Sequence, residues 1–215
     1  MTTGERLFFF ILAFRFLVAN PVSLDFPLIP KINGYDLNNN GISDFIAFGN
    51  SGLPRTLYHV ESSSSGTEIL FEYSMPEDKN GYFTDMILGD FDYDGTIELI
   101  ASAYQDESSE IFYIFSADAM GFYSDSPLIT GVNNTRTVIN NPGKLYPMQA
   151  DANQQSMFLL SLGSPNRRVI ICEYLNGEII SRGSVGKEFL INTLAPIEIA
   201  LGDFNGDGGE DIFLL

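Results

Sequence analysis

The chain of 215 residues is 45% hydrophobic and 18% charged, with 28 Asp and Glu residues against 11 Lys and Arg residues, which gives a formal net charge of −17. This composition excludes a disordered chain and argues against binding to nucleic acids or anionic membranes, while it suits the capture of cations. The single cysteine, Cys172, excludes an intramolecular disulfide and a cysteine-based zinc cluster, and the single histidine, His59, excludes metal sites built from several histidines.

The first segment, residues 1–19, has the form of an export signal. Residues 7–19 are apolar apart from Arg15, and a membrane-spanning helix needs about 20 apolar residues. A short apolar stretch that ends in a small residue, here Ala19, is typical of a secretory signal peptide. We therefore predict a signal peptide over residues 1–19, no stable membrane span, and an extracellular or cell-surface location, the periplasm included. The alternative is an edge strand or a buried first segment of the fold.

An acidic segment of nine residues occurs three times in the rest of the chain. The copies begin at Asp36, Asp90 and Asp203, and each has oxygen-bearing side chains at positions 1, 3, 5 and 9 and a glycine at position 6. A fourth segment, residues 151–155, keeps only the first half of the pattern, and we assign it no metal. The four segments begin 52–61 residues apart and an apolar run follows each of them, so the repeating unit contains a strand, an acidic loop and a second strand.

Each unit continues with two further predicted strands. Residues 111–115 are apolar on both alternating faces, so this strand must be covered on both sides. Residues 169–175 and 178–180 flank the dipeptide Asn176-Gly177, which favours a tight hairpin turn. Four strands per unit predict an all-β fold, a β-propeller of four-stranded antiparallel blades over residues 20–215.

The predicted blades cover about residues 27–77, 82–132, 143–190 and 195–215, and the fourth blade is truncated. We expect an incomplete arc of about three and a half blades that belongs to a longer protein, because closed propellers contain about four to eight blades.

The acidic loops have the composition of a calcium site. Calcium takes six to eight oxygen ligands, and a loop with a sharp turn at its glycine points positions 1, 3 and 5 inward, adds a carbonyl at position 7 and closes with the acid at position 9. EF-hand loops carry a Glu at position 12. The corresponding residues here are Ala47, Ala101 and Leu214, so the loops differ from EF-hands. The predicted calcium ligands are Asp36, Asn38, Asn40, Ile42 and Asp44; Asp90, Asp92, Asp94, Thr96 and Glu98; and Asp203, Asn205, Asp207, Gly209 and Asp211.

The acidic loops and their flanking strands resemble FG-GAP repeats, which are also grouped with VCBS repeats, the calcium-loop blades of integrin α-type propellers. Residues 89–100 and 202–215 carry the resemblance best, and the loop at Asp36 has Asn at two ligand positions. The resemblance covers about residues 27–215. It implies a bladed propeller, calcium in the loops and an extracellular or surface setting, and it assigns neither a ligand nor an activity.

We assign no catalytic residue. A pair of carboxylates for glycoside cleavage stays an open alternative, because the 28 acidic residues offer many pairs and the sequence gives no distances between them. His59 is interpreted as a strand residue and Cys172 as a buried thiol without chemistry. We expect a secreted or surface calcium-binding propeller that acts as a binding or adhesion scaffold for a protein or polysaccharide. The alternative is the propeller part of a secreted polysaccharide-acting enzyme, a lyase or hydrolase, and the scarcity of basic residues favours the scaffold.

Overall fold

A computed structural model describes residues 28–49, 52–64, 66–106, 108–118, 120–121, 123–135, 139, 141–148, 157–162, 168–185 and 198–214. The predicted signal peptide and the segment at residues 151–155 lie outside these ranges. The described residues contain strands and turns and no helix, so among them no apolar helix is long enough to cross a membrane.

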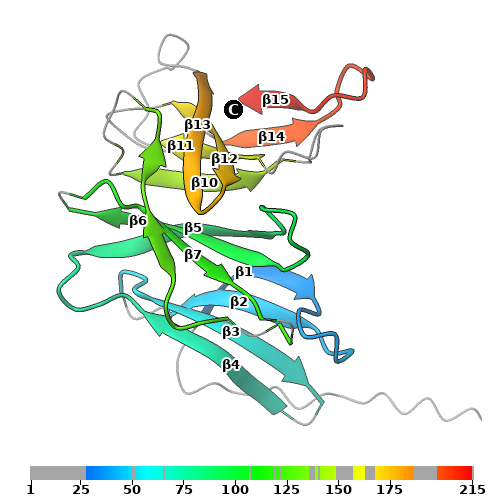
Figure 1. Cartoon of the computed structure of the whole chain (residues 1–215). Coiled ribbons are helices and arrows are strands. Elements are labelled where there is room, and N and C mark those ends of the chain that lie inside the picture. The colour runs from blue at the N-terminus through cyan, green and yellow to red at the C-terminus, as the bar shows by residue number, and fades with distance from the viewer. Residues whose placement is uncertain are drawn as a thin grey trace, which may run out of the picture.

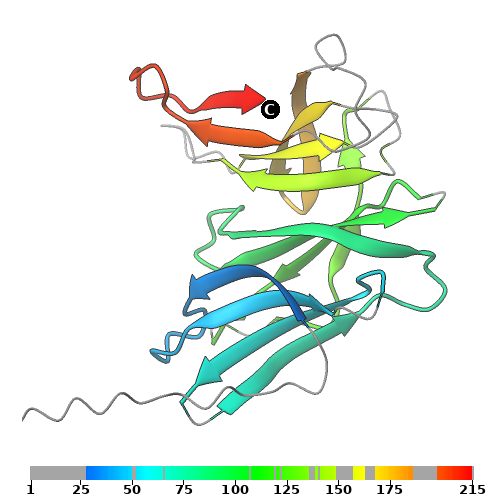
Figure 2. The ribbon, with the colours of Figure 1, turned by 180° about the vertical axis from the view of Figure 1, so that it is seen from behind.

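The strands form four successive sheets that stack on one another from β1–β4 to β14–β15 (Figures 1 and 2). In the first three sheets, strands that follow one another in the chain are antiparallel neighbours. This confirms the predicted all-β class and the four-stranded antiparallel sheets. The described residues do not form a closed ring.

The first two sheets have four strands each, in the order of the chain. The first sheet consists of β1 (Leu28–Tyr35), β2 (Asp44–Gly49), β3 (Thr56–Ser63) and β4 (Gly66–Ser74). The second consists of β5 (Gly81–Gly89), β6 (Glu98–Gln105), β7 (Phe112–Ser116) and β8 (Leu128–Thr130).

The third sheet has the same four-stranded plan with one addition. Its antiparallel strands are β10 (Pro142–Pro147), β11 (Met157–Leu162), β12 (Val169–Leu175) and β13 (Glu178–Val185). The short β9 (Val132–Asn133), which follows the last strand of the second sheet in the chain, pairs with β13 in parallel. Two more strands, β14 (Ile199–Gly202) and β15 (Asp211–Leu214), form an antiparallel pair.

The core lies between the sheets. The second sheet is buried on both faces: Phe112 and Ile114 of β7 pack toward the third sheet, while Tyr113 and Phe115 pack toward the first. These four side chains are at most 2% exposed, as the apolar alternation of this strand predicts. The hairpin between β12 and β13 also confirms its prediction, because Asn176 and Gly177 both have positive φ angles, 52° and 82°.

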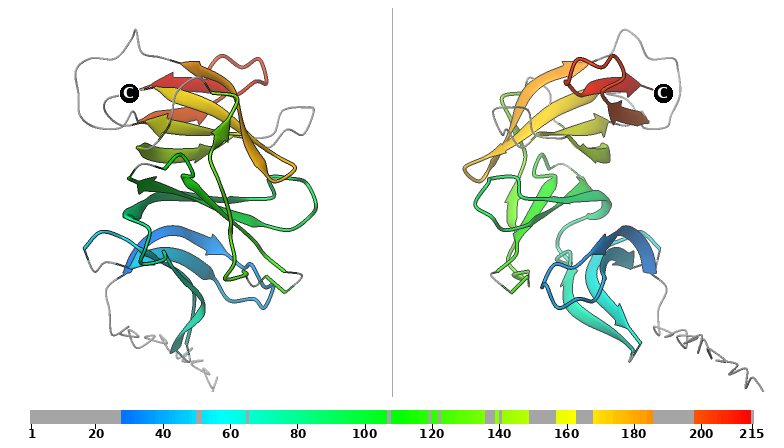
Figure 3. Two further views of the ribbon diagram at one scale, coloured as in Figure 1. Left: turned by 60° about the vertical axis from the view of Figure 1, so that its left-hand side comes forward. Right: turned by 90° about the vertical axis from the view of Figure 1, so that its right-hand side faces the viewer.

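The first strands of neighbouring sheets lie side by side, with β5 between β1 and β10 (Figure 3). All three carry a β-bulge near the middle: register shifts fall at Lys31 in β1, at Thr84 in β5 and at Gly143-Lys144 in β10. A bulge redirects the side chain of the extra residue. In all three sheets, the bulge therefore changes the direction in which side chains of the first strand point.

Candidate functional site

The three acidic loops occupy equivalent places in the fold. Each joins the first strand of a sheet to the second: β1 to β2, β5 to β6, and β14 to β15. Their backbones also agree, because positions 4 and 6 have positive φ angles in every copy. The angles are 56° and 82° at Asn39 and Gly41, 61° and 88° at Tyr93 and Gly95, and 77° and 86° at Gly206 and Gly208. The glycine predicted to permit the turn therefore takes the required conformation in all three.

The loops also share one pattern of hydrogen bonds from the backbone to the predicted ligand side chains. The acid at position 9 accepts the N–H of position 2: Asp44 from Leu37 at 2.6 Å, Glu98 from Phe91 at 2.7 Å, and Asp211 from Phe204 at 3.0 Å. In each copy the Asp at position 1 accepts the N–H of the glycine at position 6, at 2.8–3.2 Å. These bonds orient the side chains toward the inside of the turn before any ion binds.

The second loop brings three carboxylates together. Ligand oxygens of Asp90, Asp92 and Glu98 all lie within 4.8 Å of one another. Glu98 is completely buried, and loss of hydration, together with the charges of Asp92 and Asp94, raises its pKa to about 7 although the Phe91 N–H stabilises the carboxylate. An all-oxygen set with this negative charge fits a hard cation such as calcium.

The fourth acid of the second loop has a different local role. Hydrogen bonds from the Thr96 hydroxyl, at 2.5 Å, and from the Thr96 N–H, at 2.7 Å, hold Oδ1 of Asp94 and lower the pKa of this carboxyl. Asp94 is therefore not part of the three-carboxylate group, although it stays charged beside it.

The first loop gains an acid from outside its own nine residues. The side-chain amides of Asn38 and Asn40 both donate to Oε2 of Glu61 in β3, the former at 3.2 Å. Glu61 lies directly opposite Asp44 in the β2–β3 register. The sequence pattern did not reveal Glu61, because it lies 17 residues beyond the end of the loop; the strand register is the signal that locates it.

The buried side of the first loop contacts the single histidine. Asp44 is 2% exposed and its Oδ1 lies 3.3 Å from Nε2 of His59, which is fully buried in β3. Burial lowers the pKa of His59, although the carboxylate of Asp44 opposes this shift. The ring of Tyr123 meets His59 edge-on at 5.8 Å. His59 is thus a strand residue, as predicted, that packs behind the loop.

The position 2 side chain distinguishes the second loop from the third. Phe91 is 5% exposed and stacks edge-on against Phe158 of the third sheet at 6.0 Å. Its equivalent Phe204 is 58% exposed and contacts only Phe213 of β15 among aromatic rings of the described chain. The second loop is therefore anchored in the core, whereas the third lies on a surface.

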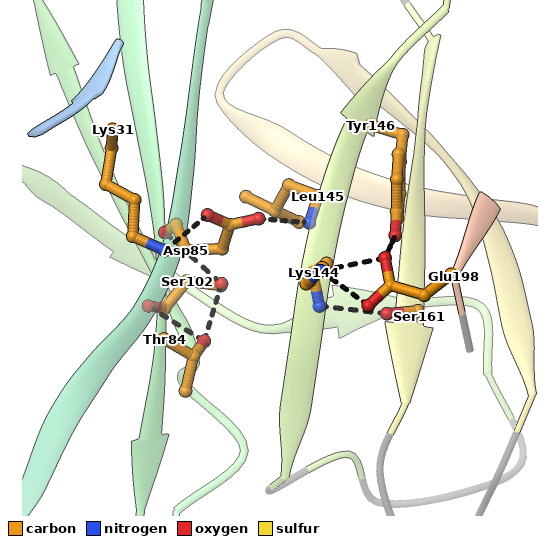
Figure 4. Close-up of polar contacts among 9 residues, drawn as sticks. All are labelled: Lys31, Thr84, Asp85, Ser102, Lys144, Leu145, Tyr146, Ser161 and Glu198. Carbon is orange, nitrogen blue, oxygen red and sulfur yellow. Dashed lines mark hydrogen bonds and ion pairs between the residues drawn. The ribbon is translucent and has the colours of Figure 1, made fainter. Parts of the chain in front are cut away.

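A second group of polar residues lies along the bulged first strands of the sheets (Figure 4). Nζ of Lys31 lies 3.4 Å from Oδ1 of Asp85, and Oδ2 of Asp85 accepts the N–H of Leu145 at 2.9 Å. Farther along, Nζ of Lys144 contacts both carboxylate oxygens of Glu198 at 2.6 and 2.7 Å. We call Lys31, Asp85, Lys144, Tyr146 and Glu198 the inner-strand row. No periodic pattern in the sequence indicates this row, because its members come from four separate units.

Tyr146 completes this row. Its hydroxyl donates to Glu198 at 3.2 Å and accepts the N–H of Ile199 at 3.2 Å. Burial is the main cause that raises the pKa of Tyr146 to about 12, and the charge of Glu198 adds to it. The row thus combines two basic side chains, two acidic side chains and a phenol that keeps its proton at neutral pH, and these groups can both donate and accept hydrogen bonds.

Cys172 has no place in either group. It is fully buried in β12, and burial raises the pKa of its thiol. The thiol therefore stays protonated, and the predicted buried position of Cys172 is confirmed.

Comparisons with known proteins identify the fold and not the family. No protein-family model matches the sequence, and no curated protein matches it. Three solved structures share the fold over 90% of the chain: a Bacillus licheniformis rhamnogalacturonan lyase PL11 (13% identity, TM-score 0.52), the exotype rhamnogalacturonan lyase YesX (12%, 0.51) and the rhamnogalacturonan lyase YesW (12%, 0.54). The chain spans only 41–43% of the length of these proteins.

Proposed function

We propose that the four sheets are successive blades of a calcium-stabilised β-propeller that is part of a secreted, polysaccharide-acting lyase. The observation that carries this proposal is the fold, which agrees with three rhamnogalacturonan lyases over 90% of the chain. Fold likeness alone is associational support for a function, so the proposal also depends on what the two polar groups can do.

Calcium is the proposed ion of the acidic loops. The shared turn and hydrogen bonds support the ligand sets predicted from the sequence, as does the oxygen cluster of Asp90, Asp92 and Glu98. Asp90, Asp92 and Glu98 would hold the ion with the Thr96 carbonyl and with Asp94 beside them, as the sequence predicts, and a bound ion would neutralise the mutual repulsion of these acids and stabilise the folded blade. The likeness of these loops to FG-GAP and VCBS repeats belongs to the same proposal.

The inner-strand row is the proposed contact with the polysaccharide. Lys144 and Glu198 keep 46% and 53% of their side-chain surface exposed, so their heads are open to solvent. In a lyase, a base removes a proton from the carbon next to the uronate carboxylate and the C–O bond on the neighbouring carbon breaks. The departing sugar oxygen takes up a proton, and a carbon–carbon double bond remains between the two carbons. The row binds and orients the chain in this proposal, and no catalytic residue is assigned.

A binding or adhesion scaffold is the second candidate. It is favoured by the burial of His59, because the single histidine of the chain is inaccessible as a proton-transfer group. Such a scaffold would use the same calcium loops and would bind its ligand without cleaving it.

The two candidates separate in one experiment on the 215-residue chain. The chain is incubated with rhamnogalacturonan in calcium, and both retention on the immobilised polysaccharide and ultraviolet absorbance of unsaturated ends are measured. Absorbance that grows with time supports the lyase, and retention alone supports the scaffold. Loss of retention in Lys144→Ala but not in Lys79→Ala, an ordinary surface lysine, supports the inner-strand row. A chain that shows no retention and no increase in absorbance would contradict both candidates.

A further inference from the structure

A hollow of about 200 Å³ lies where β9, β12 and β13 meet in the third sheet. Its wall includes Asn134 and Thr135 just after β9, Arg168 and Ile170 at the start of β12, and Ser181 and Ser184 of β13. The hollow therefore depends on β9, the short parallel strand that adds to the four-stranded plan of this sheet.

Arg168 differs from every other basic residue that the structure describes. Four of the other side chains pair with carboxylates: Lys31, Lys79, Lys144 and Arg182. The fifth, Arg55, donates hydrogen bonds to backbone carbonyls. The half-buried Arg168 side chain makes no ion pair or hydrogen bond to any described residue. In a chain with a net charge of −17, a guanidinium with no carboxylate partner in the described part of the chain is unexpected, and it points to an anionic ligand.

The other walls of the hollow supply uncharged hydrogen-bonding groups. Ser184 lies opposite Ile170 in the register of β12 and β13, so it faces the same side of the sheet. Ser181 precedes the bulge at Arg182, whose side chain is held by Glu173. Nδ2 of Asn134 donates to the Ser181 carbonyl at 3.4 Å, which holds the end of β9 against β13. The hydroxyls of Ser181 and Ser184 can each donate and accept a hydrogen bond.

The hollow is distant from the second acidic loop. Arg168 stands at the start of β12, and Tyr174 stands near its other end, where Asp92, Glu98 and Asp94 add to burial in raising the pKa of this tyrosine. Six residue steps along a strand separate the two positions by about 20 Å. A ligand in the hollow would therefore contact neither a metal ion of the second loop nor its carboxylates.

We propose that this hollow binds the carboxylate of a single acidic sugar unit, with Arg168 as a two-pronged partner and Ser181 and Ser184 as partners of the sugar hydroxyls. One guanidinium matches the single charge and planar shape of a carboxylate, whereas a phosphate dianion calls for further cations that the described wall lacks. The volume of about 200 Å³ gives room for one sugar unit inside the hollow. This inference rests on the proposed function in one respect: the proposed function is the reason for naming a sugar acid, and not some other small carboxylate, as the ligand.

The test is a titration of the 215-residue chain with galacturonate, with galactose as the uncharged match, followed by nuclear magnetic resonance shifts. We expect galacturonate to shift Ser184 and Arg168 signals, galactose to bind at least about tenfold more weakly, and Arg168→Gln to weaken galacturonate binding at least about tenfold. Lys79→Gln is the control and should bind as the parent does. Equal binding of galactose, or unchanged binding in Arg168→Gln, would overturn the proposal, as would equally tight binding of inorganic phosphate.

Two further arms keep this result separate from the proposed function. Arg168→Lys keeps the charge and loses the two-pronged geometry, so it should bind with intermediate strength, and it replaces Arg168→Gln if that variant fails to fold. Asp92→Ala should leave galacturonate binding unchanged because the loop is distant. Galacturonate binding without any cleavage of polysaccharide by this chain would favour the scaffold and keep the hollow, while cleavage without galacturonate binding would favour the lyase and overturn the hollow.

Discussion

Asp85 and Leu145 join two neighbouring sheets: Oδ2 of the Asp85 carboxylate accepts the backbone N–H of Leu145 at 2.9 Å. The other oxygen of Asp85 faces Lys31 of the first sheet at 3.4 Å, so one carboxylate connects three sheets through their first strands. The Asp85 side chain is only 15% exposed. A hydrogen bond of this kind is expected to be stronger than one on an open surface, since less water competes for it.

Replacing Asp85 should therefore destabilise the fold. We expect Asp85→Ala to lower the free energy of unfolding by about 1–3 kcal/mol, because the Leu145 N–H loses a charged acceptor. Asp85→Asn keeps an acceptor oxygen and should cost less. Urea unfolding measures both, and Asp78→Ala, at an exposed position, is the control. An Asp85→Ala variant as stable as this control would show that the carboxylate does not hold the sheets together.

The anchoring of the second loop by Phe91 predicts a difference between two equivalent phenylalanines. Phe91→Ala should cost about 3–5 kcal/mol of folding free energy, because it leaves a cavity against Phe158. Phe204→Ala, at the same position of the third loop, should cost less than about 1 kcal/mol, since Phe204 is largely exposed. Thermal unfolding of the two variants compares them under identical conditions, and equal losses would contradict the placement of the loops.

Alkaline pH should weaken the fold through Tyr113. Its side chain is fully buried, Gln105 Nε2 donates to its hydroxyl at 2.9 Å, and burial raises its pKa to about 12. Because the folded-state pKa lies above the ordinary value of 10.0, the stability from this shift is fully present below pH 10 and is lost as pH rises toward 12. We expect part of the alkaline loss of stability to be absent in Tyr113→Phe, measured by urea unfolding at a series of pH values. An unchanged pH dependence would show that Tyr113 ionises as freely as in the unfolded chain.

Local chemistry made much of the fold predictable. Three short patterns each permit few conformations. They are the glycine at position 6 of each acidic loop, the Asn176-Gly177 turn, and the strand at residues 111–115 that is apolar on both faces. All three predictions are confirmed. The propeller itself, the bound ion and the fate of residues 1–19 stay predictions.

The remaining features depend on tertiary register, which one sequence does not contain. Glu61 meets the first loop only because β3 pairs with β2 in the register that places it opposite Asp44. The inner-strand row depends on bulges at Lys31, Thr84 and Lys144, and the added residue of a bulge has no fixed sequence pattern. Glu61 also gives the first loop a third carboxylate, which equals the three carboxylates at the ligand positions of the third loop.

Calcium binding at the second loop is the central claim, and calorimetric titration of the parent chain against Asp92→Ala and Asn38→Ala tests it most directly. Charge and anchoring predict that the loop at Asp90 binds most tightly. The carboxylates within the nine-residue segments alone rank the loop at Asp203 next and the loop at Asp36 last. Calcium should raise the melting temperature of the parent, because it binds the folded state. Asp92→Ala should remove more of this increase, and more of the binding heat, than Asn38→Ala. Equal losses in the two variants would contradict the ranking, and a parent chain that neither binds calcium nor melts higher in its presence would contradict the metal assignment.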